Sequence, residues 1–315
     1  MVTQLKPGQH ITEYFILRSK ERRTKKNNEA YLSLELGDAS GRIFGSLWEN
    51  IEQAEKVLEP GALVKVRATV IEWHGRNHLS VEKVRLVNER DKISIEQFLP
   101  QSSRPLDELM AGFKSQIAQV ENAFLRQVLE RITANPQLEQ AVLKAPGGKL
   151  WHHCYLGGLL EHTLKVAELA LTIARHYEHI DRDLLLTGAL LHDIGKCLEY
   201  QWAGFIDYSD IGRLHGHITI GYHLVAQIID AIDDFPPSLR NELLHLILSH
   251  QGQKEHGSPV EPMMREAIIL NFADELDSKL GAFDRIYHSE YEPGRTWSNY
   301  VNLLDRFLYF GKSGA

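Results

Sequence analysis

Histidines and aspartates on the apolar sides of predicted helices are the residues of this chain best suited to chemistry. Residues 190–200 read LLHDIGKCLEY, so His192, Asp193 and Lys196 end an apolar helical stretch that begins near Leu184. Burying such groups in a protein core costs free energy unless other groups compensate them. Their position on an apolar helix therefore indicates a catalytic or ligand-binding site.

Four further segments place one polar residue each on the apolar face of a predicted helix, as judged from apolar neighbours at helical spacing. These residues are His162, His217, His250 and Asp274. Taken singly, each histidine is better explained as a hydrogen-bonded core residue. A divalent cation at the centre of a helical bundle would satisfy all of these groups together, so the joint pattern predicts a metal site. Imidazole mixed with carboxylate suits manganese, iron or zinc better than calcium.

The elements that position these residues form the C-terminal half of the chain. From Leu106 onward the periodicity is helical, with no convincing strand, and 13 of the 16 histidines lie beyond residue 150. The sequence KAPGGK at 144–149 interrupts the helices and predicts the start of the main helical domain. Residues 91–105 contain two prolines and predict a linker.

Residues 10–88 predict a small β-domain. Short alternating runs such as AYLSLELGD and ALVKVRATVIEW are separated by turn signals such as Glu59-Pro60-Gly61. One helix, at about residues 50–58, stands between the third and fourth of five strands. This order is typical of the OB-fold, a small closed Greek-key barrel, although other small barrels share the strand count.

The predicted fold class is therefore multidomain α+β. We expect an N-terminal five-stranded OB-fold β-barrel at residues 1–90, a linker with connector helices at 91–143, and an all-α C-terminal domain at 144–315.

Charge is divided unevenly along the chain. Residues 1–90 carry 15 Lys and Arg against 12 Asp and Glu, a balance of +3, whereas the rest carries 20 against 30, a balance of −10. This asymmetry is expected if only the N-terminal part meets a polyanion. No apolar run is long enough to span a membrane, and the first ten residues lack the apolar core of a signal peptide, so we expect a cytoplasmic protein. The two cysteines, Cys154 and Cys197, are expected to be reduced packing residues.

Basic and aromatic residues of the predicted barrel suggest a surface for single-stranded nucleic acid. OB-folds hold single strands by stacking bases on aromatic side chains above a basic groove. The candidate contacts are Arg22, Arg23, Lys25, Lys26, Tyr31, Phe44, Trp73 and Arg76. The run RSKERRTKKNN, taken alone, is as well explained by a solvated hairpin. Half of the barrel aromatics Tyr31, Phe44, Trp48 and Trp73 are expected to lie in the core.

The ordered series His162, His192-Asp193 and Asp274, with HDIGK written out in full, resembles the HD phosphohydrolase superfamily. The resemblance implies a helical HD domain at residues 144–315 that binds divalent metal and hydrolyses phosphomonoesters or phosphodiesters. His217 and His250 resemble the extra histidines of members that hold two metals.

A wider resemblance covers nearly the whole chain. An OB-like N-terminus, HHCYLGGLLEHTLKV, HDIGK, HGHITIG, SHQG followed by GSPVEP, and ADELDSKL occur in the order found in the YhaM-type 3′–5′ exoribonucleases. The resemblance implies hydrolysis of single-stranded RNA, with single-stranded DNA as a further substrate, to nucleoside 5′-monophosphates. It implies two divalent ions, manganese first, with magnesium, iron, cobalt or zinc as alternatives. The direction of digestion, the preference for RNA and the metal rest on this resemblance and not on residue spacing.

Relatives carry a second histidine directly after the position of His250, where this chain has Gln251. Either that neighbour is dispensable or His256 replaces it.

The roles expected of the ligands follow from their charge. Asp193 has two carboxylate oxygens and can bridge two ions, which would stabilise the entering and leaving oxygens of a phosphodiester. His162, His192 and Asp274 would complete one ion, and His217 and His250 the other. Lys196 would neutralise a phosphate oxygen, or it is a snorkelling residue at a helix end.

Three residues near the ligands have less certain roles. His152 and His153 would contact substrate or donate a proton, or they are surface histidines. Asp277 is a weaker ligand candidate, expected to orient a ligand histidine or to pair with Lys279 or Arg285.

Two other functions stay open. The first is an HD enzyme for nucleotides or cyclic dinucleotides, although the Gly-Tyr-Pro typical of the latter is missing after His250. The second is a non-catalytic single-strand-binding protein with a vestigial HD site, against which the intact ligand series counts. The oligomeric state is also open, and the connector at 106–140 or the tail LLDRFLYFGK could form an interface.

Overall fold

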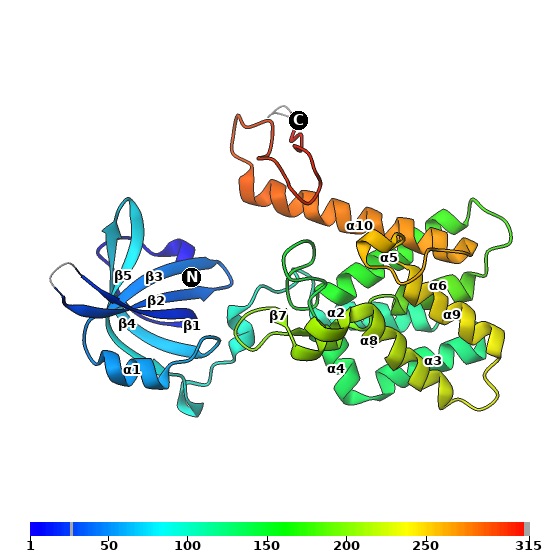
Figure 1. Ribbon diagram of the computed structural model, residues 1–315, viewed down its shortest axis with the longest axis horizontal. Coiled ribbons are helices and arrows are strands. Elements are labelled where there is room, and N and C mark those ends of the chain that lie inside the picture. The colour runs from blue at the N-terminus through cyan, green and yellow to red at the C-terminus, as the bar shows by residue number, and fades with distance from the viewer. Residues whose placement is uncertain (26–27, 312–315) are drawn as a thin grey trace. The chain divides into compact units, whose positions relative to one another are not determined.

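The structure is a computed structural model that describes residues 1–25 and 28–311 (Figure 1). The chain forms two compact units. The first is Met1–Gln101 together with Gln201–Asp207, and the second is Ser102–Tyr200 together with the residues from Tyr208 onward. The division of the chain by function, at residues 90 and 143, stays a prediction.

The first unit is built on a closed barrel of five strands. These are β1 (His10–Thr24), β2 (Ala30–Asp38), β3 (Gly41–Leu47), β4 (Leu63–Trp73) and β5 (Arg76–Leu86). The strand order is β1-β2-β3-β5-β4, with β4 also paired to β1, and helix α1 (Ile51–Val57) lies between β3 and β4 in the chain. Only β3 and β5 pair in parallel. This arrangement confirms the predicted OB-fold.

The first strand closes the barrel because it pairs with two neighbours. Its N-terminal half pairs with β4 and its C-terminal half with β2, and a register shift between Leu17 and Ser19 marks the bend. Alternate residues of β2, namely Leu32, Leu34 and Leu36, fill the interior and are fully buried. Their two-residue period is that of a strand with one face in the core.

The barrel core is aliphatic apart from Phe15. Phe44 and Trp73 are exposed, and Tyr31 and Trp48 are only half-buried. The expectation that half of the barrel aromatics lie in the core is therefore wrong, because aliphatic side chains already fill the interior. All four aromatic side chains remain at the barrel surface.

The second unit is helical, and this confirms the predicted fold class. Its helices are α2 (Leu106–Ile117), α3 (Ala123–Ala134), α4 (Pro136–Lys144), α5 (Gly158–Ala174), α6 (Arg182–Leu191), α7 (Lys196–Glu199), α8 (Asp210–Asp230), α9 (Pro237–Ser249) and α10 (Arg265–Glu290). Two strands of two residues each, β6 (Tyr200–Gln201) and β7 (Asp207–Tyr208), stand between α7 and α8 where no strand was predicted. Among the described residues, we find no helix that is both long and apolar enough to cross a membrane.

The helices expected to form a connector pack on the others within this unit. Helices α2 and α4 contact α5, and α3 contacts α6. The side chains of Asn122 and Asn135 cap α3 and α4 by accepting hydrogen bonds from the first backbone amides of each helix. Helices α5, α6, α9 and α10 in turn pack on one another, and α8 packs on α9. The segments that carry the predicted ligands are therefore held by a common core.

Replacing Leu34 with alanine should lower the free energy of unfolding by about 2–5 kcal/mol, because the change leaves a cavity in the barrel core. Urea unfolding of the full chain, followed by tryptophan fluorescence, measures this loss. The matched control Phe44→Ala removes an exposed side chain and should cost less than about 1 kcal/mol. Equal losses in the two variants would contradict the assignment of core and surface.

Candidate metal centre

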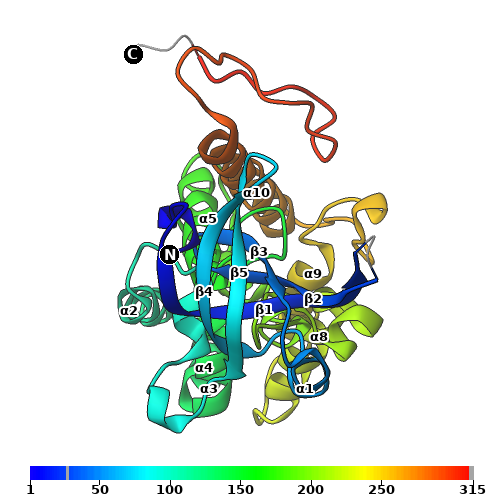
Figure 2. The same cartoon turned by 90° about the vertical axis from the view of Figure 1, so that its left-hand side faces the viewer.

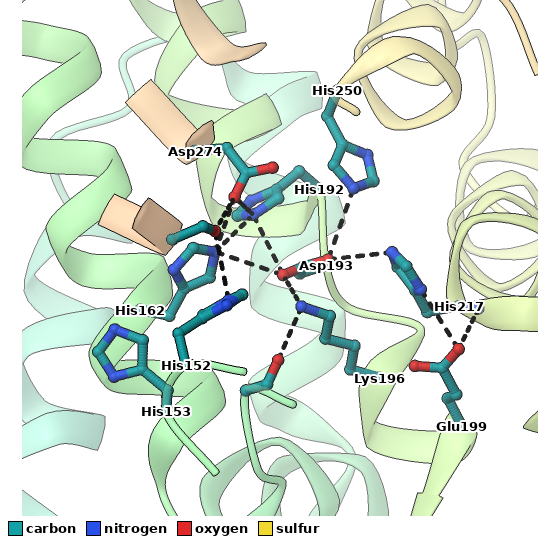
Figure 3. A network of polar contacts seen from close by, with 12 residues as sticks. His152, His153, His162, His192, Asp193, Lys196, Glu199, His217, His250 and Asp274 are labelled. Carbon is teal, nitrogen blue, oxygen red and sulfur yellow. Dashed lines mark hydrogen bonds and ion pairs between the residues drawn. The ribbon is translucent and has the colours of Figure 1, made fainter. Parts of the chain in front are cut away.

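The six predicted ligands come from five segments of the second unit and meet at one place (Figure 3). Helix α5 carries His162, the turn after α6 carries His192 and Asp193, α8 carries His217, His250 follows α9, and α10 carries Asp274. Figure 3 shows the side chains of these residues converging on Asp193.

The carboxylate of Asp193 faces a different histidine pair with each oxygen. Its Oδ2 lies 3.4 Å from the Nε2 atoms of both His162 and His192. Its Oδ1 lies 3.4 Å from Nε2 of His217 and 3.5 Å from Nε2 of His250. Each oxygen of Asp193 thus faces its own histidine pair, and the bridging of two ions by this residue stays a prediction.

The donor atoms fit a divalent metal. Asp274 Oδ1 lies 3.1 Å from Nε2 of His162, and the Nε2 atoms of His162 and His192 face each other at 3.2 Å. Within the described part of the chain, Asp193 Oδ1 and His250 Nε2 are buried without a hydrogen-bond partner. Buried polar atoms normally have a partner, and a cation between these atoms would supply one.

Two glycines let His217 reach Asp193. A Cβ atom on Gly195 would lie 2.0 Å from the backbone oxygen of His217, so only glycine allows α8 to approach the turn after α6 this closely. Helix α8 is also broken at Gly216, whose φ of 70° and ψ of 155° suit glycine. The break directly precedes His217. The glycines of HDIGK and HGHITIG therefore position a ligand.

The charges at the centre keep the carboxylates ionised. Burial raises the pKa of Asp193, but the nearby positive charges, Lys196 first, outweigh burial and lower that pKa well below its usual value. Burial lowers the pKa of His162, but hydrogen bonds with Asp193 and the aspartates of α10 outweigh burial and raise it. The carboxylates are therefore available as ligands at neutral pH.

Lys196 is buried beside Asp193. Its Nζ donates to Oδ2 of Asp193 at 2.6 Å and to the backbone oxygen of Gly147 at 2.8 Å, and the residue is only 6% exposed. Burial lowers the pKa of Lys196, but the charges of Asp193 and Asp274 outweigh burial and raise it. Lys196 therefore neutralises Asp193, and its contact with a phosphate oxygen stays a prediction.

Asp277 holds two histidines behind the centre. Its Oδ2 lies 2.7 Å from Nδ1 of His162 and 2.9 Å from Nε2 of His153. The other nitrogen of His153 lies 2.7 Å from the hydroxyl of Tyr155. Asp277 thus orients a ligand histidine, one of its two expected roles. His153 is buried with both ring nitrogens engaged, so the expectation that it contacts substrate is wrong.

His152 is the better placed of the two neighbouring histidines. Its ring centroid lies 5.1 Å from that of His162, and its Nε2 lies 3.3 Å from Oγ of Ser278. Burial lowers the pKa of His152 to about 2, so the ring is neutral. Its Nδ1 is buried and has no hydrogen-bond partner among the described residues.

Two residues at the centre were not predicted from the sequence. The Oε1 of Glu199 accepts a hydrogen bond from the backbone amide of His217 at 3.0 Å and lies 3.3 Å from its Nδ1. The side-chain amide of Gln251 lies 3.4 Å from Nε2 of His217, whereas His256 is exposed. Glu199 belongs to LLHDIGKCLEY itself, and a second acidic residue beside an apolar run was the signal that could have identified it.

The predicted nucleic-acid contacts on the barrel divide into two groups. Arg22 forms an ion pair with Glu55, and Arg23 forms one with Glu21. Both arginines thus form ion pairs with surface carboxylates. Such pairs are typical of a solvated hairpin. Lys26 lies outside the described residues.

The remaining predicted contacts are aromatic or basic side chains at the barrel surface. Nζ of Lys25 lies 3.7 Å above the ring of Trp48, which stacks on Tyr31 at 4.7 Å. Phe44 and Trp73 are exposed. Arg76 is also exposed and is the pairing partner of Trp73 in the β4–β5 hairpin.

Replacing Asp277 with asparagine should weaken metal binding by about 10–100-fold, because loss of the carboxylate frees the ring of His162. Isothermal titration of the full chain with Mn²⁺ measures the affinity. The control Glu275→Gln removes an exposed carboxylate of the same helix, paired with Lys279, and should leave the affinity unchanged. An unaltered affinity in Asp277→Asn would show that this contact does not position a ligand.

Comparisons with known proteins agree with the geometry. The HD domain family model matches residues 159–279, a range that contains all six predicted ligands. The second OB-fold domain of replication protein A from Methanococcus maripaludis is 22% identical to this chain and covers 28% of it and 92% of that structure, with a TM-score of 0.23. The strand order of the barrel, and not this likeness, identifies the OB-fold.

Curated relatives match nearly the whole length of the chain. The 3′-5′ exoribonuclease YhaM of Bacillus subtilis is 31% identical over 304 residues, which cover 96% of this chain and 95% of the relative. The protein of the same name from Bacillus velezensis is 32% identical with the same coverage. These matches confirm the resemblance, and the chain belongs to the YhaM family of 3′–5′ exoribonucleases.

Proposed function

We propose that this protein is a metal-dependent exonuclease that digests single-stranded RNA from the 3′ end to nucleoside 5′-monophosphates, with single-stranded DNA as a further substrate. The observation that carries the proposal is the position of Asp193 between two histidine pairs in a chain of this family. Phosphodiester hydrolysis needs charge stabilisation on both sides of the phosphorus, and this donor set could supply it through metals.

Two divalent ions would occupy the centre, with manganese the first choice and magnesium, iron, cobalt or zinc as alternatives. His162, His192 and Asp274 would hold one ion with Oδ2 of Asp193. His217 and His250 would hold the other with Oδ1. Bound there, such ions would polarise a phosphate and lower the pKa of a water molecule for in-line attack.

Residues around the proposed ligands orient their side chains and keep Asp193 ionised. Asp277 orients the ring of His162 and Glu199 orients that of His217, which fixes which nitrogen faces the centre. Lys196 holds the carboxylate of Asp193 in place and in its ionised form. His152, with one nitrogen unengaged, is the residue available to contact substrate beside His162.

The barrel, residues 1–90, would bind the strand that is being digested. Phe44 and Trp73 are exposed aromatic residues of the kind on which OB-folds stack bases. Lys25, Arg76 and the pair Tyr31 and Trp48 supply further charge and ring surface. Residues 144–315 would carry the chemistry, with residues 91–143 joining the two.

Replacing Asp193 with asparagine should lower the rate of RNA hydrolysis by more than about 100-fold, because the neutral side chain cannot hold two cations. Asparagine is preferred to alanine, since its amide oxygen keeps a hydrogen-bond acceptor for the buried Nζ of Lys196. Digestion of end-labelled single-stranded RNA with Mn²⁺ measures the rate. The control Asp230→Asn alters an exposed carboxylate that pairs with Arg240 and should retain full activity.

The same assay tests the polarity. A 5′-labelled strand should shorten stepwise, while a 3′ label should be released at once as a mononucleotide. Activity on mononucleotides alone, or full activity in Asp193→Asn, would contradict the proposal.

The double variant Phe44→Ala/Trp73→Ala should weaken the binding of long single-stranded RNA. Each lost stack costs roughly 1–3 kcal/mol, or about 5–150-fold in affinity. Fluorescence anisotropy of a labelled strand, without metal, measures binding, and hydrolysis of a dinucleotide should be unchanged. Val57→Ala, which shortens an exposed side chain at the end of α1, serves as the control. Unchanged affinity in the double variant would give the barrel a different role.

A further inference from the structure

Helix α10 has an exposed apolar stripe. Ile268, Phe272, Leu276 and Leu280 follow one another at i+4 spacing and are between 43% and 60% exposed. At 100° per residue, Asp274 lies on the opposite side of the helix, facing the candidate metal centre. The helix therefore has one side in the site and another that stays exposed among the described residues.

The segment that follows α10 forms an arm, which we define as residues 291–311. Backbone bridges pair Trp297 with Tyr309 and Val301 with Arg306, as in a short hairpin. Figures 1 and 2 both show the arm leaving the C-terminal end of α10. Phe310 packs at its base against Tyr287, with ring centroids 5.2 Å apart.

The outer face of the arm is aromatic. Trp297 contacts Tyr309 at 4.9 Å between ring centroids, and Tyr300 contacts Phe307 at 5.3 Å. These four side chains and Leu303 are exposed. A two-stranded hairpin is only marginally stable in water by itself, so an uncovered arm of this composition is an unfavourable arrangement.

Stripe and arm together match a protein interface in size. Nine half-exposed apolar side chains at about 100 Å² each offer roughly 900 Å², and a stable interface buries about 800 Å² on each partner. The charges beside the stripe are mixed, since Glu275 pairs with Lys279 and the exposed Asp284 and Arg285 also oppose each other in sign. A nucleic acid would require an excess of basic residues. The surface therefore suits a protein partner.

We infer that this surface joins two copies of the chain in a symmetric dimer, with α10 packed against α10. Ridges of residues spaced by four interdigitate with an identical ridge at a crossing angle of about −50°. A two-fold axis through the stripe repeats the same contacts on both copies. Antiparallel helices would also bring the arm of one copy towards the start of the other α10, where Met263 is 78% exposed.

The dimer would cover the side of α10 opposite Asp274. The inference does not depend on the proposed reaction, because it rests only on exposed apolar side chains.

Sedimentation velocity of the full chain tests the inference. The protein should sediment as a species of about 72 kDa, twice its 36.0 kDa, and the variant Phe272→Glu/Leu276→Glu should sediment at half that mass. Val57→Glu charges a similarly exposed aliphatic residue outside this surface and should remain dimeric. A monomeric unaltered protein at every concentration, or a double variant of unchanged mass, would overturn the inference.

A second variant guards against misfolding. Leu276→Cys is a mild change near the proposed axis, and mild oxidation should link two copies through this residue on a non-reducing gel. Val57→Cys should not be linked. If the protein is dimeric but Leu276→Cys fails to form the link, the interface lies elsewhere and the inference is wrong.

Discussion

The carboxylate of Asp193 is a buried negative charge, and the arrangement of the second unit depends on how that charge is compensated. Lys196 contacts one of its oxygens, and four histidines face the two oxygens in separate pairs. Gly195 allows the close approach of α8 that brings His217 to Asp193. Groups from four segments thus offset part of the free energy needed to bury this carboxylate. A divalent metal would neutralise the remaining negative charge.

In the proposed function, the helical unit carries the chemistry and the barrel contacts the strand. In the helical unit, buried hydrogen bonds from Asp277 and Glu199 fix the ligand rings before any substrate arrives. In the barrel, an aliphatic core leaves Phe44 and Trp73 at the surface, where they can stack on any base. Helix α10 has two different sides. Its inner side supplies Asp274 to the centre, and its outer side carries the exposed apolar stripe.

Periodicity in the sequence was sufficient to predict the barrel, the helical half and the inward direction of His162. A period of 3.6 or 2 residues states which side of an element is buried, because side chains repeat on that period. The period does not predict which side chains of distant segments contact that buried side. For this reason the partner of Lys196, the buried position of His153 and the role of Glu199 became visible only in the structure.

The central claim is that Asp193 lies between two metal ions. Crystals of the full chain grown with Mn²⁺, with diffraction recorded at the manganese absorption edge, test it most directly. The account predicts two anomalous peaks, one beside Oδ2 of Asp193 with His162 and His192, and one beside Oδ1 with His217 and His250. A single peak, or a peak that does not contact Asp193, would contradict it.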